Sequence, residues 1–116
     1  MKIENWADSS KQMCQLGRNH WAVPRLIELS RDLEVMEIPL NHLHIAYTYG
    51  GDTYLREMVM HMRAVLDADL SYPIILDEDG ELMDGRHRIM KALLNGEKTI
   101  KAVRFEQNPD PCKRDD

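Results

Sequence analysis

The chain has 116 residues, of which 43% are hydrophobic and 30% are charged, and its formal net charge at pH 7 is −5. This length predicts one small domain that can bury a core without disulfides or metals. The acidic balance argues against a general nucleic-acid binder, because phosphate contacts need a basic surface, but it permits one local cationic pocket. No apolar run approaches a membrane span, and the N-terminus lacks the apolar segment of a signal peptide. We therefore expect a cytoplasmic protein in which Cys14 and Cys112 are reduced thiols.

Residues 1–34 are predicted to form an N-terminal helical extension. Pro24 suits the first turn of a helix, where its missing N–H is no loss. The apolar side of this helix consists of Leu26, Ile27, Leu29 and Leu33. We expect Trp6 and Trp21 to pack the extension onto the rest of the protein, with a partner or base-stacking surface as the alternative.

A short strand is predicted over Val35 to Leu40, where Pro39 favours the end of the strand or a sheet edge. Residues 41–52 carry polar and turn signals and include Gly50-Gly51, so we expect a loop. Asp52 is placed to cap the helix that follows.

The next helix carries an apolar stripe with regular helical spacing. Its members are Leu55, Met58, Val59, Met62, Val65 and Leu66. We expect this stripe to face the core, with its methionines acting as adaptable filler.

The continuous apolar run from Tyr72 to Leu76 predicts a strand that is covered on both faces. A tight turn over Asp77 to Gly80 leads into a short return strand, Glu81 to Met83. Asp84-Gly85 breaks this strand, and a helix is predicted over Arg86 to Leu94.

The inward residues of this last helix are predicted to be Ile89, Met90, Leu93 and Leu94, and Asn95-Gly96 is its stop signal. The alternating segment Ile100 to Phe105 predicts a closing strand, and residues 107–116 are expected to form a flexible polar tail. The element order predicts an α+β domain over residues 35–106, with a small mixed sheet flanked by helices.

The junction between the Glu81–Met83 strand and the last helix carries the clearest chemical signal. Gly85 permits a backbone turn that other residues resist, and the first turn of a helix leaves backbone N–H groups available to an anion. Arg86, His87 and Arg88 add cationic or donor side chains at the same point. An anion such as phosphate makes this arrangement favourable. In the alternative reading, Arg86 and Arg88 pair with the acidic turn DEDGE, and His87 is an ordinary surface residue.

Residues from about Val35 to Phe105 resemble the ParB N-terminal/sulfiredoxin superfamily. The segments that carry the resemblance are, in order, EIPLNHL, YLREMVMHMRAVL, YPIILDEDGELMDGRHRIMKALLNG and IKAVRF. The resemblance implies that the Gly-x-[His/Arg]-Arg turn holds nucleotide phosphates, with Gly85 forming the turn and His87 and Arg88 contacting phosphate. Arg86 stands where sulfiredoxins have their reactive cysteine, so sulfinic-acid repair is not expected.

The sequence DGRHR is closest to the Asp-Gly-His-His-Arg motif of the ParB-type free serine kinases, which implies that Asp84 acts in catalysis or in Mg²⁺ handling. Those kinases also place a catalytic glutamate in the loop after the first strand, and the corresponding stretch HLHIAYTYGGD has none. The Asn-Pro-Arg of ParB proteins is missing there as well. The residues after Phe105 show no helix-turn-helix pattern. The resemblance thus bears more on fold and pocket than on a reaction.

Three histidines are candidate metal ligands. His42 and His44 form an H-x-H pair, which shares one face of an extended segment, and His61 follows on the next helix. Spacing supplies no third ligand, so polar loop histidines are the favoured interpretation and no metal site is assigned.

The leading expectation is a domain that binds ATP or CTP, with Mg²⁺, through Gly85, Arg86, His87 and Arg88, with Asp84 as the catalytic candidate. Such a domain would hydrolyse the nucleotide or transfer phosphate to a small molecule. The alternative is a non-catalytic ParB-like adaptor in DNA partition or in plasmid or phage biology, acting through a protein partner. A nuclease is a third class, but the sequence shows no multi-carboxylate metal site for it. Direct DNA binding and membrane association are not expected.

Overall fold

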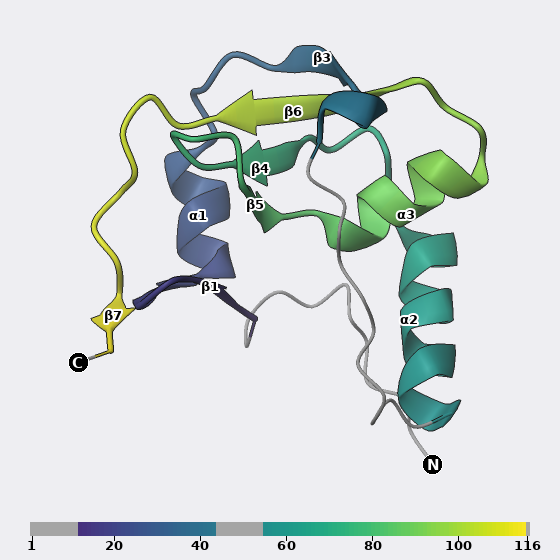
Figure 1. The fold of residues 1–116 in the computed structure, drawn as a ribbon, viewed down its shortest axis with the longest axis horizontal. Helices are drawn as coiled ribbons and strands as arrows, with labels where there is room; N and C mark the ends of the chain where they lie inside the picture. The colour runs from purple at the N-terminus through teal and green to yellow at the C-terminus, as the bar shows by residue number, and fades with distance from the viewer. Residues whose placement is uncertain (1–11, 44–54, 116) are drawn as a thin grey trace.

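The computed structural model describes residues 12–43 and 55–115, and within them it shows three α-helices and two small β-sheets (Figure 1). The helices are α1 (Val23–Leu29), α2 (Leu55–Asp67) and α3 (Arg86–Leu94), and a 3₁₀ helix, η2, spans Leu40–His42. The strands are β1 (Met13–Leu16), β2 (Asn19–Ala22), β3 (Met36–Pro39), β4 (Ile74–Leu76), β5 (Leu82–Asp84), β6 (Thr99–Arg104) and β7 (Lys113–Arg114). The predicted α+β class is confirmed. No described helix has the length and apolar character needed to cross a membrane.

The larger sheet has the strand order β3-β6-β4-β5. The central pair, β4 and β6, is parallel, whereas β3–β6 and β4–β5 are antiparallel. Two parallel strands need a crossover between them, and α3 lies within that connection, between β5 and β6 (Figure 1). The sheet is therefore mixed, as the sequence predicted, and it carries a helix in its crossover.

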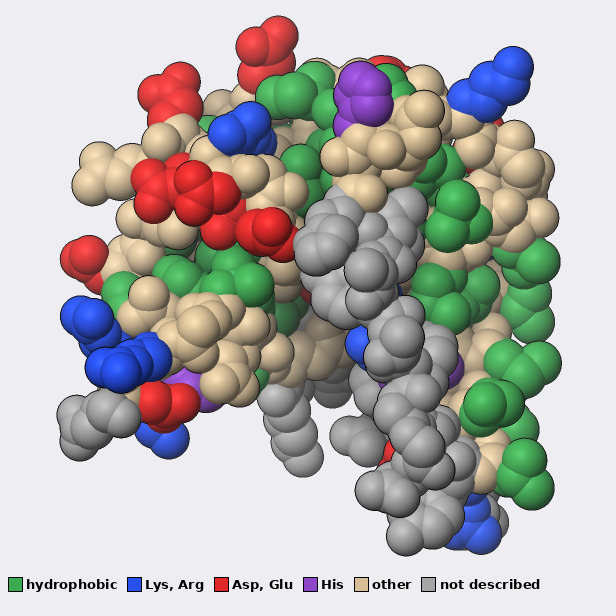
Figure 2. All heavy atoms as spheres, viewed as in Figure 1, with side chains coloured by type: hydrophobic (Ala, Val, Ile, Leu, Met, Phe, Trp, Pro, Cys, Tyr) green, Lys and Arg blue, Asp and Glu red, His purple; other side chains and the backbone are tan. Residues whose placement is uncertain are grey.

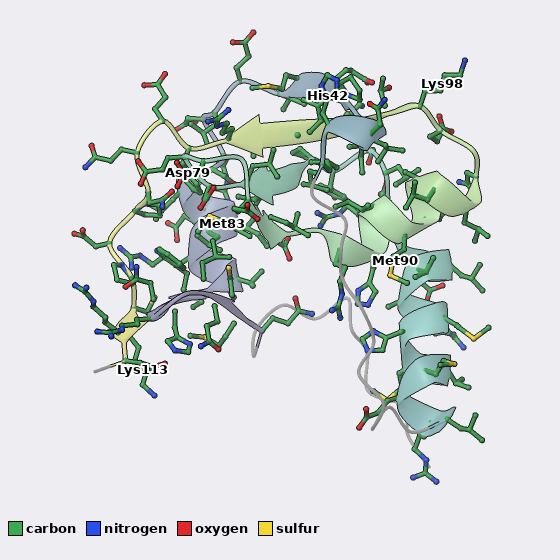
Figure 3. All side chains as sticks on the ribbon, in the orientation of Figure 1. His42, Asp79, Met83, Met90, Lys98 and Lys113 are labelled. Atoms are coloured by element: carbon green, nitrogen blue, oxygen red, sulfur yellow. The ribbon has the colours of Figure 1, made fainter. Side chains whose placement is uncertain are left out.

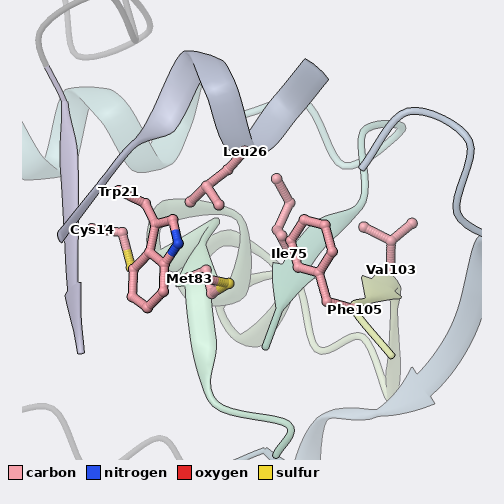
Figure 4. Close-up of a cluster of buried hydrophobic side chains, with 7 residues drawn as sticks. All are labelled: Cys14, Trp21, Leu26, Ile75, Met83, Val103 and Phe105. Carbon is pink, nitrogen blue, oxygen red and sulfur yellow. The ribbon is translucent and has the colours of Figure 1, made fainter. Parts of the chain in front are cut away.

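Both faces of this sheet are buried, and β4 contributes to each. Ile75 belongs to a cluster on one face that also contains Cys14, Trp21, Leu26, Met83, Val103 and Phe105 (Figure 4). Ile74 and Leu76 belong to the second cluster, with Leu40, Ile89, Ala92, Ile100 and Ala102. Because successive side chains of a strand point to opposite faces, an all-apolar β4 requires cover on both sides. The prediction of a strand covered on both faces is confirmed for Ile74–Leu76, whereas Tyr72 lies before the strand and is exposed.

The helical extension expected over residues 1–34 is wrong for Met13–Ala22, which form the β1–β2 hairpin. Leu16 pairs with Asn19, so the turn has two central residues, and Gly17 occupies the first of them with φ 61°. Glycine in that place is the signature of a tight hairpin turn with the twist that strands prefer. The helix after Pro24 is confirmed as α1, and Leu26 on it is fully buried.

Residues 107–116 were expected to form a flexible tail, but the described part of this segment, residues 107–115, packs onto this hairpin. β7 pairs antiparallel with β2, placing Lys113 opposite His20. The indole Nε1 of Trp21 donates to the carbonyl of Pro109 at 2.9 Å, and the backbone N–H of Cys112 donates to the carbonyl of His20 at 2.8 Å. The edge of β2 thus supplies backbone hydrogen-bond partners that fix the position of this polar C-terminal segment.

Helix α2 is present, but the expectation that its apolar stripe faces the core is wrong. Of the stripe, only Val65 is buried. The exposed members are Leu55, Met58, Val59, Met62 and Leu66. The reason is that α2 packs mainly on α3 rather than on the sheet, since α3 already covers that face. Leu93 and Leu94 on α3 are also exposed, contrary to expectation.

Candidate functional site

The turn from β5 into α3 is built around Gly85. α3 begins at Arg86, as the sequence predicted, whereas β5 runs to Asp84, one residue beyond the predicted end at Met83. Gly85 is the N-cap, with φ 115° and ψ 20°. A Cβ at this position would lie 2.5 Å from Cγ2 of Ile74, a distance that real structures avoid. The position therefore requires glycine both for its left-handed backbone and for the close packing of the turn on β4.

Asp84 and Arg88 bracket this turn and face inward. The carboxylate Oδ2 of Asp84 lies 3.6 Å from Nη1 of Arg88, and the two side chains are only 15% and 22% exposed. Nη1 of Arg88 also donates to the carbonyl of Pro73 at 3.1 Å, just before β4. Burial raises the pKa of Asp84, although the charge of Arg88 and the N–H of Gly85 act in the opposite direction. Arg88 thus ties α3 to the start of β4.

His87, on the first turn of α3, meets His61 from α2. Nδ1 of His61 and Nε2 of His87 lie 2.9 Å apart, which is a hydrogen bond in which one ring donates and the other accepts. Burial, followed by the positive charges of Arg86, His61 and Arg88, lowers the pKa of His87 to about 4. Burial and Arg86 also lower the pKa of His61. Both rings are therefore neutral at pH 7, and each can offer a polar nitrogen rather than a charge.

Arg86 supplies the positive charge of this first turn. Its side chain is partly buried and close enough to both histidines to lower their pKa values. The sequence grouped Arg86, His87 and Arg88 as candidate phosphate-binding residues, with His87 and Arg88 as the expected direct contacts. The fold separates them, because Arg88 is committed to Asp84 and Pro73 while Arg86 and His87 lie beside α2.

The acidic turn DEDGE does not hold Arg88 by any ion pair found in the described residues. Asp77 is buried, and its Oδ1 accepts the backbone N–H groups of Asp79 and Glu81 at 2.9 and 2.8 Å. The guanidinium of Arg104 donates to the carbonyl of Glu78 from the neighbouring β6. The alternative in which Arg88 pairs with this turn is therefore wrong, since its carboxylate partner is Asp84.

His61 is the residue of this site that the sequence did not connect to it. His61 and His87 are 26 positions apart, and only the packing of α2 on α3 brings them together. His42 ends η2 as an exposed residue, whereas His44 lies outside the described residues, so the H-x-H pair stays a prediction. Asp52, Gly50-Gly51 and Trp6 also lie outside them.

Among residues 12–43 and 55–115, no group of three or more His, Cys, Asp or Glu side chains is arranged to hold a metal ion. Asp84 is the carboxylate nearest the first turn of α3 in sequence, and it already forms an ion pair with the guanidinium of Arg88. A Mg²⁺ site usually takes one or two accessible carboxylates together with substrate phosphates. The described residues fit a protein-held Mg²⁺ poorly.

No family model, no curated protein and no solved structure matches this chain.

Proposed function

We propose that the first turn of α3 binds the phosphate groups of a nucleotide, ATP or CTP. The observation that carries the proposal is the left-handed Gly85 cap, which opens a nine-residue helix beside one arginine and a pair of neutral histidines. A helix start favours an anion through its backbone N–H groups and its dipole, by about 0.3–1 kcal/mol at an exposed site. The resemblance of DGRHR to the phosphate turn of ParB/sulfiredoxin-like proteins supports the same assignment.

The geometry changes the roles that the sequence suggested. Arg86 takes the role of the cation that pairs phosphate oxygens, in place of Arg88. Because one neutral ring donates its N–H to the other, only the accepting ring keeps an N–H for phosphate, and the donating ring holds its orientation. Gly85 shapes the turn, while Arg88 and Asp84 act as positioning residues that hold α3 against β4.

Binding without turnover is the form of this function that the geometry favours. Asp84, the catalytic candidate, is directed to Arg88, and the described residues offer no clear site for protein-held Mg²⁺. A hydrolase or phosphotransferase needs a group that activates water or an acceptor, and the described residues assign none. We therefore prefer a non-catalytic ParB-like module that binds the nucleotide, and nucleotide hydrolysis is the alternative.

Calorimetric titration with ATP and with CTP, each with and without Mg²⁺, tests the proposal. We expect the wild type to bind at least one nucleotide and the variant Arg86→Ala to lose at least tenfold in affinity, because a charge-assisted contact is removed. Arg63→Ala is the matched control, since Arg63 is an exposed arginine on α2 that pairs with Asp67. Absence of binding by the wild type, or equal losses in both variants, would contradict the proposal.

A further inference from the structure

Seven large apolar side chains on α2 and α3 form an exposed surface, called here the α2/α3 apolar face. They are Leu55, Met58, Val59, Met62 and Leu66 on α2 and Leu93 and Leu94 on α3, each at least 45% exposed. In Figure 2 apolar side chains gather along the right-hand edge, over these two helices. A surface of this make-up, on the order of 500 Å², lies near the upper end of what monomeric proteins leave exposed.

The spacing of these residues is that of a helix that packs lengthwise on another helix. Leu55, Val59, Met62 and Leu66 are separated by four, three and four positions. This alternation keeps one side of a helix facing a neighbouring helix over several turns. These four residues are called here the seam, or ridge, of α2. Within the described residues α2 packs mainly on α3, through Val65 and the side of the helix that carries His61, so this seam is left uncovered.

A groove lies beside this seam, between α2 and α3, with a volume of about 440 Å³. It is lined from α2 by Met58, His61, Met62, Val65 and Leu66, and from α3 by Met90 and Leu94 (Figure 3 labels Met90). Methionine side chains adapt to the shape of what they contact. The same face thus carries both an apolar ridge and an apolar groove, which a contact between identical surfaces requires.

The charges on α2 are balanced, unlike those of the whole chain. α2 carries Arg56 and Arg63 against Glu57 and Asp67, whereas the formal charge of the chain is −5. Arg63 and Asp67 pair within the helix at 3.2 Å. Two copies can therefore meet through α2 without bringing like net charges together, which they could not do through an acidic surface.

We propose that the α2/α3 apolar face joins two copies of this chain about a two-fold axis, with the α2 ridge of each copy seated in the groove of the other. A stable interface of standard size buries about 800 Å² on each partner, with an apolar centre and a polar rim. The seven side chains supply that centre, and the charged residues of α2 supply the rim. The proposal does not depend on nucleotide binding.

Sedimentation velocity tests this proposal over roughly 5–200 µM chain, a range in which mass action separates a dimer from a monomer. We expect the wild type to approach the mass of two chains at the upper end. Val59→Lys places a charge in the seam and should weaken the dimer at least tenfold. Val35→Lys is the matched control, because Val35 and Val59 are both 52% exposed and Val35 lies before β3, away from this face.

Leu55→Lys provides a second seam variant at the most exposed position of the face, where loss of folding is not expected. A dimeric wild type and Val35→Lys, with monomeric Val59→Lys and Leu55→Lys, would support the proposal. A wild type that stays monomeric over the whole range would overturn it. So would seam variants that dimerise as strongly as Val35→Lys, because the dimer would then use another surface.

Discussion

At Gly85 the backbone conformation and the packing of neighbouring atoms both exclude a side chain. Gly80 and Gly85 share positive φ values, 85° and 115°, but a Cβ on Gly80 meets nothing within 4 Å, whereas a Cβ on Gly85 meets Ile74 at 2.5 Å. The two glycines therefore separate the cost of strained backbone from the cost of a steric clash.

We expect Gly85→Ala to lower the free energy of unfolding by about 2–4 kcal/mol, the sum of backbone strain and overpacking. Gly80→Ala should cost only about 1 kcal/mol, since it carries the strain alone. Urea denaturation of both variants measures the difference. Equal losses would show that the turn does not pack on Ile74 as described.

The His61–His87 pair makes stability depend on pH in a defined direction. The pKa of His87 is about 4 in the folded protein and about 6.5 when exposed, so the unfolded chain binds the proton more readily between these values. The contribution of neutral His87 is therefore fully present above about pH 6.5 and is lost as the pH falls towards 4. The raised pKa of Asp84 acts in the opposite direction.

Comparing His87→Gln with the wild type isolates the contribution of His87, because Asp84 is present in both. The melting temperature of the wild type should fall more steeply than that of His87→Gln between pH 6.5 and 4.5. The exposed His42 provides the control, and His42→Gln should follow the wild type. Parallel curves for the wild type and His87→Gln would contradict the burial of this histidine.

At the scale of elements, contacts between helices decide where α2 sits. Nζ of Lys91 on α3 donates to the carbonyl of Leu66 at 2.9 Å and to the carbonyl of Ala68 at 2.7 Å, at the C-terminal end of α2. A cation at this end also interacts favourably with the helix dipole. This one side chain satisfies two carbonyl groups and ties α2 to α3.

Lys91→Met keeps the length of the side chain but removes its charge and its hydrogen bonds. We expect a loss of about 1–2 kcal/mol in the free energy of unfolding. Lys98→Met serves as the control, because Lys98 is exposed and projects away from the fold (Figure 3). Denaturant unfolding of the two variants gives the comparison, and similar stabilities would argue against the role of Lys91 in placing α2.

The sequence predicted the elements of the central sheet more reliably than the packing around it. The run Tyr72 to Leu76 indicated a doubly buried strand, because a continuous apolar run places apolar side chains on both faces of the strand. The stripe on α2 indicated an apolar face correctly, but spacing cannot say whether that face meets the core or a surface. The β1–β2 hairpin was not predictable from the sequence, because Gly17-Arg18 is a weaker turn signal than Asn-Gly.

In the candidate site, too, local features were predictable from the sequence, whereas contacts between distant segments were not. Glycine at position 85 and the break between β5 and α3 were predictable, because both follow from local backbone chemistry. The inward direction of Arg88 was not, since it depends on where the carbonyl of Pro73 lies in the folded chain. The pairing of His61 with His87 needs the relative position of two helices, which no local pattern encodes.

For the whole molecule, the polar and apolar features of α2 and α3 meet at His61. This residue pairs with His87 at the start of α3 and also lines the groove beside the apolar face. A nucleotide at the first turn and a second copy on the apolar face would thus share two helices. Occupancy of one site can then influence the other through the packing of α2 on α3.

The central claim is that a phosphate group binds at the first turn of α3, and NMR titration with ATP and with CTP tests it most directly. We expect the backbone amides of Arg86, His87 and Arg88 to shift on saturation and the pKa of His87 to rise from about 4, because a bound anion favours the protonated ring. By linkage, affinity should increase as the pH falls. Unchanged amide positions and an unchanged His87 pKa at high concentrations of both nucleotides would contradict the account.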